Sequence, residues 1–379
     1  MSEVKTELLF QQRSLTLYRY PKRANDLLQA WDAGDEYLIS HVEELQLAEG
    51  KNIVILNDQF GALSCWFSAK HNVTMVSDSF LACQGTADNL KLNQCNAITQ
   101  LNALDDLPEK IDLVLFKLPK SNRLLTWQLS QLRARLDSNC PVIAVNKAKD
   151  IHSSTLKLFE KHLGTTQTSL AKKKHRLVFS KADSKAGAMI NPVTEWQVDG
   201  ENYHLKNYPN VYSGESLDLG ARFMLNHIPS NDRYKHIIDL GCGNGVLSVK
   251  AAQQNPQAKI TCVDESFMAV ESAKLNLQAA LGEEHNSSFV ANNCLDGFAA
   301  ESADLVLCNP PFHQQNAITD HIAWQMFCDA KHVLNNNGQL LVIGNRHLSY
   351  DNKLSRLFGK QQVKLIASNR KFVILQATK

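Results

Sequence analysis

The sequence predicts an α/β protein made of two tandem domains, the first of them a degenerate copy of the second. Strand-like runs bounded by turn residues alternate with helical stretches along most of the 379 residues, which is typical of a parallel sheet covered by helices on both faces. The second half also repeats the residue pattern of the first with small changes in offset, which indicates a duplication. We expect domains at 1–182 and 191–379, joined by a linker at 183–190 where small and polar residues predominate.

Short apolar runs mark strands in the first half, and longer stretches between them mark helices. The expected strands are 15–20, 53–56, 73–76, 111–116, 142–145 and 177–179. The expected helices are 30–42, 60–69, 80–92, 124–136 and 153–162. The second half opens with alternation at 196–205 around Asp199-Gly200, which predicts a hairpin. The α/β pattern resumes at Ile237 and is interrupted by an irregular loop after Phe312.

The repeat is clearest at the first strand of each half and the turn that follows it. Residues 53–64 align with residues 237–248. Smaller matches pair Ser79 with Ser266, Asn89 with Asn276 and Asp112 with Asp304. The second copy reads DLGCGNG over 239–245 and the first reads ILNDQFG over 55–61, so two of three glycines are missing from the first. Because a sheet can keep its core after losing a site, we interpret the first domain as degenerate; a chance likeness between two α/β domains is the alternative.

A glycine-rich turn joins a strand to a helix in the second half. The strand 237–240 is followed by this turn and then by an apolar helix from Val246. The turn contains Gly241, Gly243 and Gly245. Glycines at such a place let the backbone approach a ligand closely and turn into the helix. The next strand, 260–263, ends at Asp264, whose carboxylate can accept hydrogen bonds from the two hydroxyls of a ribose. This arrangement predicts a site for an adenosine-containing ligand.

Asp239, inside the strand before the turn, narrows the class of ligand. The turn reads Gly-x-Gly-x-Gly rather than Gly-x-Gly-x-x-Gly, so the dinucleotide pattern is not met. The Asp239 carboxylate would repel a pyrophosphate, whereas it would attract the cationic amino group of S-adenosylmethionine. We therefore expect S-adenosylmethionine as the cofactor. Asn293, after the third strand, is either a neighbour of the adenine ring or an ordinary turn residue.

The run from Leu305 to Phe312 reads as a buried strand that stops at Asn309 and two prolines. Asn309 is therefore expected at the carboxyl end of a strand, where open α/β sheets place their ligands. The Asn309 side-chain oxygen and the Pro310 carbonyl can accept the two hydrogens of a planar amine, and Phe312 offers a flat face to the ring that carries it. A strand-to-turn junction without function is the alternative, and the neighbouring glycine turn favours the amine site.

Together these motifs resemble those of the seven-stranded, S-adenosylmethionine-dependent methyltransferases that modify exocyclic amines or amides. The resemblance is carried by Asp239–Gly245, Asp264 and Asn309–Phe312. Within that group, the duplicated layout with a degenerate first copy resembles the ribosomal RNA guanine-N2 methyltransferases. The run Leu56–Cys65 fits the large-subunit enzymes better than the small-subunit enzymes. The resemblance spans essentially the whole chain and implies two tandem Rossmann-like S-adenosylmethionine methyltransferase-type domains.

The resemblance implies methylation of the exocyclic N2 amine of a guanine in 23S rRNA of the large ribosomal subunit. Guanine N2 is a poor nucleophile because its lone pair is delocalised into the ring. Hydrogen bonds to Asn309 and the Pro310 carbonyl would favour a pyramidal nitrogen, so that positioning contributes much of the rate. Phe312 would stack on a guanine swung out of its helix or loop. We expect His313 to be a structural loop residue rather than a catalyst.

Basic residues are in excess in the first half only. Residues 1–190 contain 24 Lys and Arg against 20 Asp and Glu, and the remainder contains 16 against 18. The candidate contacts to RNA phosphates are Lys172, Lys173, Lys174 and Arg176, together with Lys117, Lys120 and Arg123 at the degenerate strand end. We expect the first domain to bind RNA through them; a solvated face is the alternative. The expected partner is large-subunit ribosomal RNA, protein-poor or naked.

The composition excludes several classes of protein. A hydrophobic content of 44% and a charged content of 21% indicate a globular rather than a disordered chain. No stretch approaches the ~20 apolar residues of a membrane span. Nine cysteines without metal-site spacing predict no metal and a reducing cytoplasm. Three alternatives stay open: guanine-N2 methylation of 16S rRNA, protein glutamine N5 methylation, and, in another class, an S-adenosylmethionine-sensing RNA-binding protein.

Overall fold

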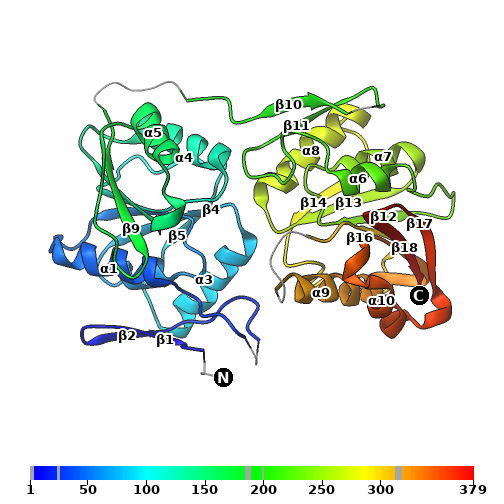
Figure 1. Ribbon diagram of the computed structural model, residues 1–379, viewed down its shortest axis with the longest axis horizontal. Helices are drawn as coiled ribbons and strands as arrows, with labels where there is room; N and C mark the ends of the chain where they lie inside the picture. Colours follow the sequence, from blue (N-terminus) through cyan, green and yellow to red (C-terminus); the bar gives the residue numbers. More distant parts are fainter. Residues whose placement is uncertain (1–3, 24–25, 184–188, 199, 312–317) are drawn as a thin grey trace. The chain divides into compact units, whose positions relative to one another are not determined.

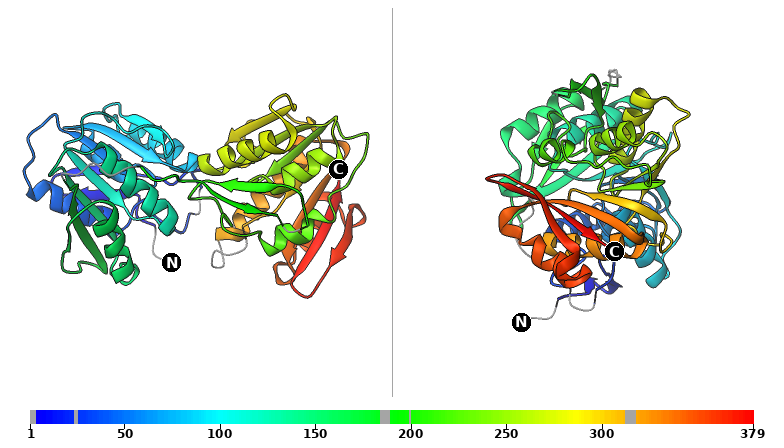
Figure 2. Two further views of the ribbon diagram at one scale, coloured as in Figure 1. Left: turned by 90° about the horizontal axis from the view of Figure 1, so that it is seen from above. Right: turned by 90° about the vertical axis from the view of Figure 1, so that its right-hand side faces the viewer.

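The computed structural model of the chain describes residues 4–23, 26–183, 189–198, 200–311 and 318–379. The chain divides into two compact units, Met1–Pro192 and Val193–Lys379. Each unit has a seven-stranded sheet with helices on both faces (Figures 1 and 2). This confirms the predicted pair of α/β domains. The expected linker at 183–190 falls largely outside the described residues.

The sheet of the first unit follows the order β5-β4-β3-β6-β7-β9-β8. Its strands, in that order, are Thr99–Asn102, Asn72–Ser77, Asn52–Leu56, Leu113–Lys117, Pro141–Lys147, His175–Lys181 and Thr166–Thr168. Its helices are α1 (Ala33–Glu44), α2 (Ala62–Phe67), α3 (Phe80–Leu92), α4 (Asn122–Arg135) and α5 (Ser153–His162). A separate hairpin, β1 (Glu7–Phe10) and β2 (Arg13–Thr16), precedes them.

Alternating side chains of the central strands bury both faces of this sheet. Ile53 and Ile55 pack into a core shared with α1 and α2, whereas Val54 and Leu56 pack into a core shared with α4 and α5. Successive residues of a strand point to opposite faces, so an unbroken apolar run is required where both faces are covered. This is why the apolar run at 53–56 predicted its strand correctly.

The second unit has the same topology, in the order β14-β13-β12-β15-β16-β18-β17. Its strands, in that order, are Ser287–Ala291, Lys259–Asp264, His236–Leu240, Ala303–Cys308, Leu334–Asn345, Phe372–Thr378 and Val363–Ser368. Its helices are α6 (Leu219–Leu225), α7 (Val246–Gln254), α8 (Phe267–Leu281), α9 (Ile318–Val333) and α10 (Tyr350–Phe358). The predicted hairpin is present as β10 (Thr194–Gln197) paired with β11 (His204–Asn207); Asp199 lies outside the described residues.

One strand in each unit departs from the expected parallel arrangement. Strand β9 runs antiparallel to both of its neighbours, β7 and β8, and β18 runs antiparallel to β16 and β17. In each case the chain crosses over to an outer position and then returns by a short turn, which reverses the last strand. Sequence analysis also missed β5 and β8, because these edge strands are short, polar and largely exposed (TQLN and TQT).

The two units share hydrogen bonds as well as strand order. Asn89 of α3 donates to the carbonyls of Tyr18 and Phe60 and accepts from the Tyr18 amide. Asn276 of α8 makes the same three bonds, with the Lys206 carbonyl and amide and with the Asn244 carbonyl. The same residue type therefore ties an extended segment to the turn before the second helix in both copies. This supports the interpretation of the repeat as a duplication.

Candidate active site

The predicted motifs of the second unit converge at the carboxyl ends of three neighbouring strands. Leu240, the last residue of β12, pairs with Val263 of β13 on one side and with Cys308 of β15 on the other. The glycine turn, Asp264 and Asn309 follow directly from these strand ends. Because β12 lies where the strand order reverses, this edge is the topological switch point at which such sheets bind ligands.

All three glycines of the turn have left-handed backbones. Gly245 is required for helix packing, whereas Gly243 leaves space for a ligand. Gly245 has φ +78°, and a Cβ on it would lie 2.9 Å from the Ala273 Cα, so this glycine allows α7 to approach α8. Gly243 has φ +54°, and a Cβ on it would have no atom within 4 Å, so its outer side is open to a ligand. The first unit keeps the counterpart of Gly245: Gly61 has φ +80°, and its Cβ would lie 3.0 Å from the Thr86 Cα. Packing explains why this one glycine persists in the degenerate copy.

Asp239 carries a buried carboxylate with one unused oxygen. The residue is 1% exposed, and its Oδ2 accepts a hydrogen bond of 2.5 Å from the Ser248 Oγ. Its Oδ1 has no hydrogen-bond partner among the described residues. Burial raises the pKa of Asp239 to about 7, although the hydrogen bond from Ser248 opposes this shift. A buried acceptor without a partner is costly, so the geometry fits a carboxylate that receives a cationic group from a ligand.

The other predicted cofactor residues lie beside this carboxylate. Asp264 accepts a hydrogen bond of 2.9 Å from the Gly243 amide at Oδ2 and one of 3.1 Å from the Ser266 amide at Oδ1. These bonds fix Asp264 against the glycine turn, and burial raises its pKa. Asn293 is 8% exposed and follows β14, the strand that pairs with β13. Contacts of Asp264 with a ribose and of Asn293 with an adenine stay predictions.

Asn309 follows β15 and presents an acceptor atom that lacks a partner. Its Oδ1 is buried and, within the described residues, accepts no hydrogen bond. Its Nδ2 donates to the Asp218 Oδ2 over 3.5 Å. Pro310 is buried beside it. Phe312 and His313 lie outside the described residues, so the stacking role expected of Phe312 stays a prediction.

Asp218 was missed by the sequence analysis. It is the N-cap of α6 and lies 91 residues before Asn309 in the sequence, so no local motif links the two. A signal was present in the repeat: Asp218-Leu-Gly220 matches Asp32-Ala-Gly34 of the first half, where Asp32 is the N-cap of α1. Both acids begin the helix that precedes the first long strand of their sheet.

The first unit has a buried ion pair at the edge that corresponds to this site. Lys117, the last residue of β6, is 8% exposed, and its Nζ lies 2.6 Å from the Asp35 carboxylate and 3.8 Å from Asp32. Burial disfavours the charged ammonium, but these two carboxylates outweigh it and hold the pKa of Lys117 above its ordinary value. The expectation that Lys117 contacts RNA phosphates is therefore corrected, because its ammonium is committed to a buried pair.

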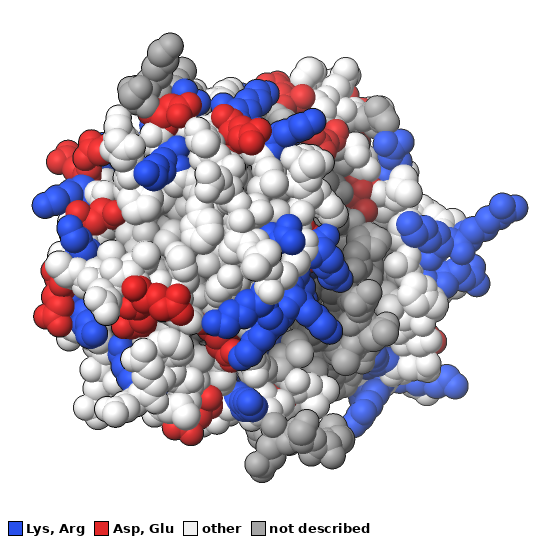
Figure 3. Space-filling view, turned by 60° about the vertical axis from the view of Figure 1, so that its left-hand side comes forward, with Lys and Arg blue, Asp and Glu red and all other residues white. Residues whose placement is uncertain are grey.

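The remaining basic candidates lie nearer the surface. Lys172, Lys173, Lys174 and Lys120 are exposed, whereas Arg123 and Arg176 are half-buried. The 172–174 turn leads into His175, which pairs with Lys147 at the carboxyl end of β7. This turn therefore lies at the same edge of the sheet as the end of β6. On the face that Figure 3 presents, Lys and Arg side chains gather into groups. RNA binding by these residues stays a prediction.

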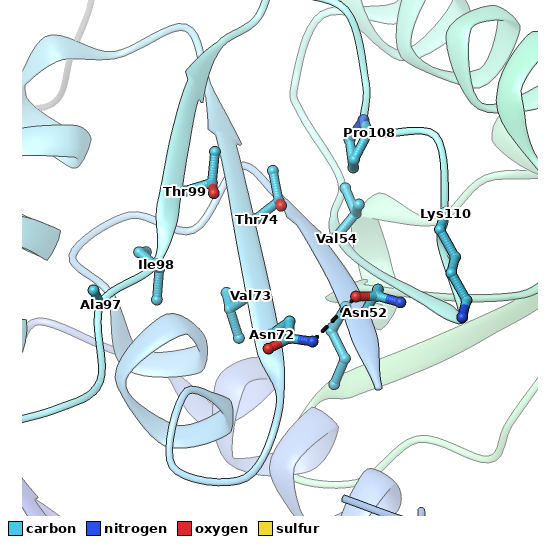
Figure 4. A pocket seen from close by; sticks show the side chains of 11 residues that line it. Asn52, Val54, Asn72, Val73, Thr74, Ala97, Ile98, Thr99, Pro108 and Lys110 are labelled. Carbon is cyan, nitrogen blue, oxygen red and sulfur yellow. Dashed lines mark hydrogen bonds between the residues drawn. The ribbon is translucent and has the colours of Figure 1, made fainter. Parts of the chain in front are cut away.

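A cavity of about 390 Å³ in the first unit lies elsewhere. It is lined by the first residues of β3 and β4, Asn52 and Asn72, and by Lys110. Figure 4 shows the Asn72 side chain donating to the Asn52 Oδ1, a bond of 3.2 Å. Because these residues begin their strands, the cavity opens at the amino edge of the sheet, opposite the edge where ligands of such folds bind.

Other kinds of site find no support in the described part of the chain. There, His, Cys, Asp and Glu side chains nowhere gather in groups of three or more that could hold a metal ion. None of the helices in the described ranges has the length and apolar character needed to cross a bilayer. None of the nine cysteines, all of which are described, is part of a disulfide bond.

Comparisons with known proteins agree with this geometry. Residues 5–184 match the family model described as the RLMG N-terminal domain, and residues 202–376 match the methyltransferase small domain. The solved structure of the T. thermophilus 16S rRNA N2 G1207 methyltransferase (RsmC), in complex with AdoMet and guanosine, superposes with a TM-score of 0.78. The match covers 99% of this chain and 97% of that chain at 18% identity, so it shows a shared two-domain fold.

Curated relatives are much more similar in sequence. The proteins named ribosomal RNA large subunit methyltransferase G from Vibrio parahaemolyticus and from Vibrio vulnificus are each 68% identical to this chain over 376 residues. The matches cover 99% of this chain and 98% and 100% of those proteins, respectively. The namesake from Aliivibrio fischeri is 66% identical over 377 residues and covers 99% of both chains. This chain therefore belongs to the ribosomal RNA large subunit methyltransferase G family of S-adenosylmethionine-dependent methyltransferases.

Proposed function

We propose that this enzyme methylates the exocyclic N2 amine of a guanine in the 23S rRNA of the large ribosomal subunit. The observation that carries the proposal is the buried Oδ1 of Asn309, an acceptor without a partner among the described residues, at a strand end beside the glycine turn. An amine that carries two hydrogens is the group that such an acceptor suits. The names of the relatives support ribosomal RNA of the large subunit as the substrate, and the likeness to RsmC, a 16S rRNA N2 methyltransferase bound to guanosine, supports guanine N2.

The cofactor would be held by residues whose geometry already suits it. Bound S-adenosylmethionine supplies an electrophilic methyl group on a sulfonium leaving group. The Asp239 Oδ1 would accept a hydrogen bond from the cationic amino group of S-adenosylmethionine. The open space beside Gly243 leaves room for this ligand. Asp264, fixed by the Gly243 and Ser266 amides, would face the ribose hydroxyls.

The amine would be held by Asn309 and Pro310. The Asn309 Oδ1 and the Pro310 carbonyl would each accept one N2 hydrogen, which favours a pyramidal nitrogen whose lone pair is directed at the methyl group. On methyl transfer, the substrate nitrogen would gain the methyl group together with the positive charge that the sulfonium gives up. The nitrogen then loses a proton to water. No strong base is required before transfer, so positioning supplies much of the rate.

The first unit would bind the RNA through exposed lysines at its carboxyl edge. Lys120 and the turn Lys172–Lys174 lie there, and Lys117 is left out because it is buried. Phosphate neutralisation by such residues is independent of base sequence. A guanine within folded rRNA must leave its stack to reach a strand-end site, which favours protein-poor or naked RNA in the cytoplasm as the substrate.

The proposal is tested by methyl transfer with labelled S-adenosylmethionine to rRNA from cells that lack the protein. 23S rRNA, 16S rRNA and a glutamine-containing protein fraction are supplied separately, and the modified nucleosides or amino acids are identified by mass spectrometry. We expect N2-methylguanosine in 23S rRNA. Label confined to 16S rRNA, label in methylglutamine, or cofactor binding without transfer to any of these substrates would each contradict the proposal.

A further inference from the structure

We propose that Asp218 is a positioning residue for the reaction: its carboxylate holds the Asn309 amide with Oδ1 directed at the amine. This inference rests on the proposed function of Asn309. Asp218 is itself held in place by two contacts. Its Oδ2 accepts a hydrogen bond of 2.9 Å from the Ala221 amide, and its Oδ1 accepts one of 3.3 Å from the Tyr212 hydroxyl. The contact to Asn309 Nδ2, 3.5 Å long, therefore comes from a carboxylate that is already fixed.

The chemistry of the two groups makes this contact selective. An asparagine amide can flip by rotating its terminal group, which swaps the positions of its acceptor oxygen and its donor NH₂ group. A carboxylate only accepts hydrogen bonds, so Asp218 favours the orientation in which the Nδ2 of Asn309 faces it. The Oδ1 then faces away from Asp218, buried and without a partner among the described residues. In the reverse orientation, Asn309 would present N–H groups to the N–H groups of the amine, and the amine would lose its acceptor.

The negative charge of Asp218 also suits the reaction. A hydrogen bond to a charged group polarises the amide, which makes its oxygen a stronger acceptor. The substrate nitrogen gains positive charge as the methyl group arrives, so an acceptor strengthened in this way stabilises the transition state more than the ground state. Asp218 would therefore act on the rate of transfer and not on the affinity for the cofactor.

The first unit supplies an independent observation. Asp32, the N-cap of α1, lies 3.8 Å from the Nζ of Lys117, the strand-end residue at the place of Asn309. The carboxylate of a helix N-cap thus lies beside the strand-end residue in both copies. In the second copy this residue is an amide whose Oδ1 has no partner among the described residues. In the first copy it is an ammonium that Asp32 and Asp35 hold by charge. The acid next to the strand end is therefore a repeated feature of the fold, and the residue that it holds determines whether a site exists.

The test uses two variants that preserve the helix cap, because Asn and Ser are both good N-caps. Asp218→Asn keeps the shape of the side chain but removes its charge and its exclusive acceptor character. Asp218→Ser keeps a hydroxyl near the Ala221 amide but is too short to hold Asn309. We expect the single-turnover rate of methyl transfer to rRNA to fall about 10- to 100-fold in both. The Kd of S-adenosylmethionine and the Tm should remain those of the wild type.

A double-mutant cycle shows whether Asp218 acts through Asn309. In an Asn309→Ala background, Asp218→Asn should cause no further loss of rate. Wild-type rates in both single variants would overturn the inference and leave Asp218 as a helix cap only. Additive losses in the cycle would also overturn it, because Asp218 would then act independently of Asn309. Failure of the proposed function is distinguishable, because in that case the wild-type enzyme itself would form no N2-methylguanosine.

Discussion

The Ser248 hydroxyl donates to one oxygen of the Asp239 carboxylate and leaves the other oxygen without a partner among the described residues. The first unit lacks this arrangement, because Ile55 replaces Asp239 and the Ser64 hydroxyl donates instead to Asp58, over 2.8 Å. The degenerate copy has therefore kept the serine, whose hydroxyl donates to a different acid, but it has lost the carboxylate that could bind a ligand. This contrast leads to a prediction about pH.

Asp239 should make cofactor binding depend on pH. Its folded pKa of about 7 lies above the ordinary value, so the charged form destabilises the ligand-free fold. Any stability contributed by its protonated form is present at low pH and is lost as the pH rises through about 7. Binding of a cationic amino group requires the charged form, so affinity for S-adenosylmethionine should rise about tenfold between about pH 6 and about pH 8. Calorimetric titration across this range measures the change.

The control is Asp239→Asn. Because Asn does not ionise, any remaining pH dependence in this variant comes from the ionisable groups of the ligand. We expect this variant to bind S-adenosylmethionine more weakly at about pH 8 and to lose the protein's share of the pH dependence. A wild-type pH profile in the variant would show that another group is responsible.

Two glycines of the turn should respond differently to alanine. In Gly245→Ala, the Cβ would meet the Ala273 Cα at 2.9 Å in a left-handed backbone, so we expect a loss of about 2–4 kcal/mol in the unfolding free energy of the second unit. In Gly243→Ala the new Cβ would lie in open space, so the unfolding free energy should fall by only about 1 kcal/mol. The main effect of this variant should be on cofactor affinity. Urea unfolding and calorimetric titration separate the two effects. Equal stability losses would contradict the packing argument.

Lys117 should matter for stability and not for RNA binding. Lys117→Met would leave the Asp35 carboxylate buried without its ammonium, which costs about 3–5 kcal/mol for a broken buried pair. Adding Asp35→Asn should restore part of this loss, because the uncompensated charge is then removed. RNA affinity, measured by filter binding on the folded protein, should be unchanged in the double variant. A large fall in RNA affinity there would revive the original expectation for Lys117.

Exposed lysines at the carboxyl edge of the first unit should set the salt dependence of RNA binding. Changing Lys172, Lys173 and Lys174 to Gln should weaken binding and lower the slope of log affinity against log salt by up to about 2, at about 0.7 for each phosphate contact. S-adenosylmethionine affinity should not change. The matched control changes three exposed lysines of the same unit that lie outside this turn, Lys70, Lys91 and Lys110. Equal effects in both triple variants would show that only net charge matters.

The sequence predicted those parts of the fold that local patterns determine. Buried strands such as β3 and β12 appear as apolar runs, and the glycine turn and Asn309 follow directly from strand ends, so their convergence could be anticipated. The antiparallel direction of β9 and β18 could not be predicted, because the direction of a strand depends on how the chain returns to the sheet. The edge strands β5 and β8 carry too few apolar residues to be distinguished from loops.

Residues whose role depends on distant partners were the ones misjudged or missed. Lys117 was expected on the surface because an isolated lysine usually lies there, but Asp35, 82 residues earlier, neutralises it in the interior. Asp218 was missed because its contact to Asn309 spans 91 residues. Neither contact produces a recognisable motif in the local sequence. Comparison of the two halves at Asp32-Ala-Gly34 and Asp218-Leu-Gly220 was the one available signal.

The most direct test of the central claim is methyl transfer to 23S rRNA by the wild type and by Asn309→Ala, with the product nucleoside identified by mass spectrometry. We predict N2-methylguanosine with the wild type and a rate at least about 100-fold lower with Asn309→Ala at saturating cofactor. The Kd of S-adenosylmethionine should be the same for both proteins. The account would be contradicted if the product were N6-methyladenosine, or if Asn309→Ala bound S-adenosylmethionine much more weakly while keeping the wild-type rate at saturation.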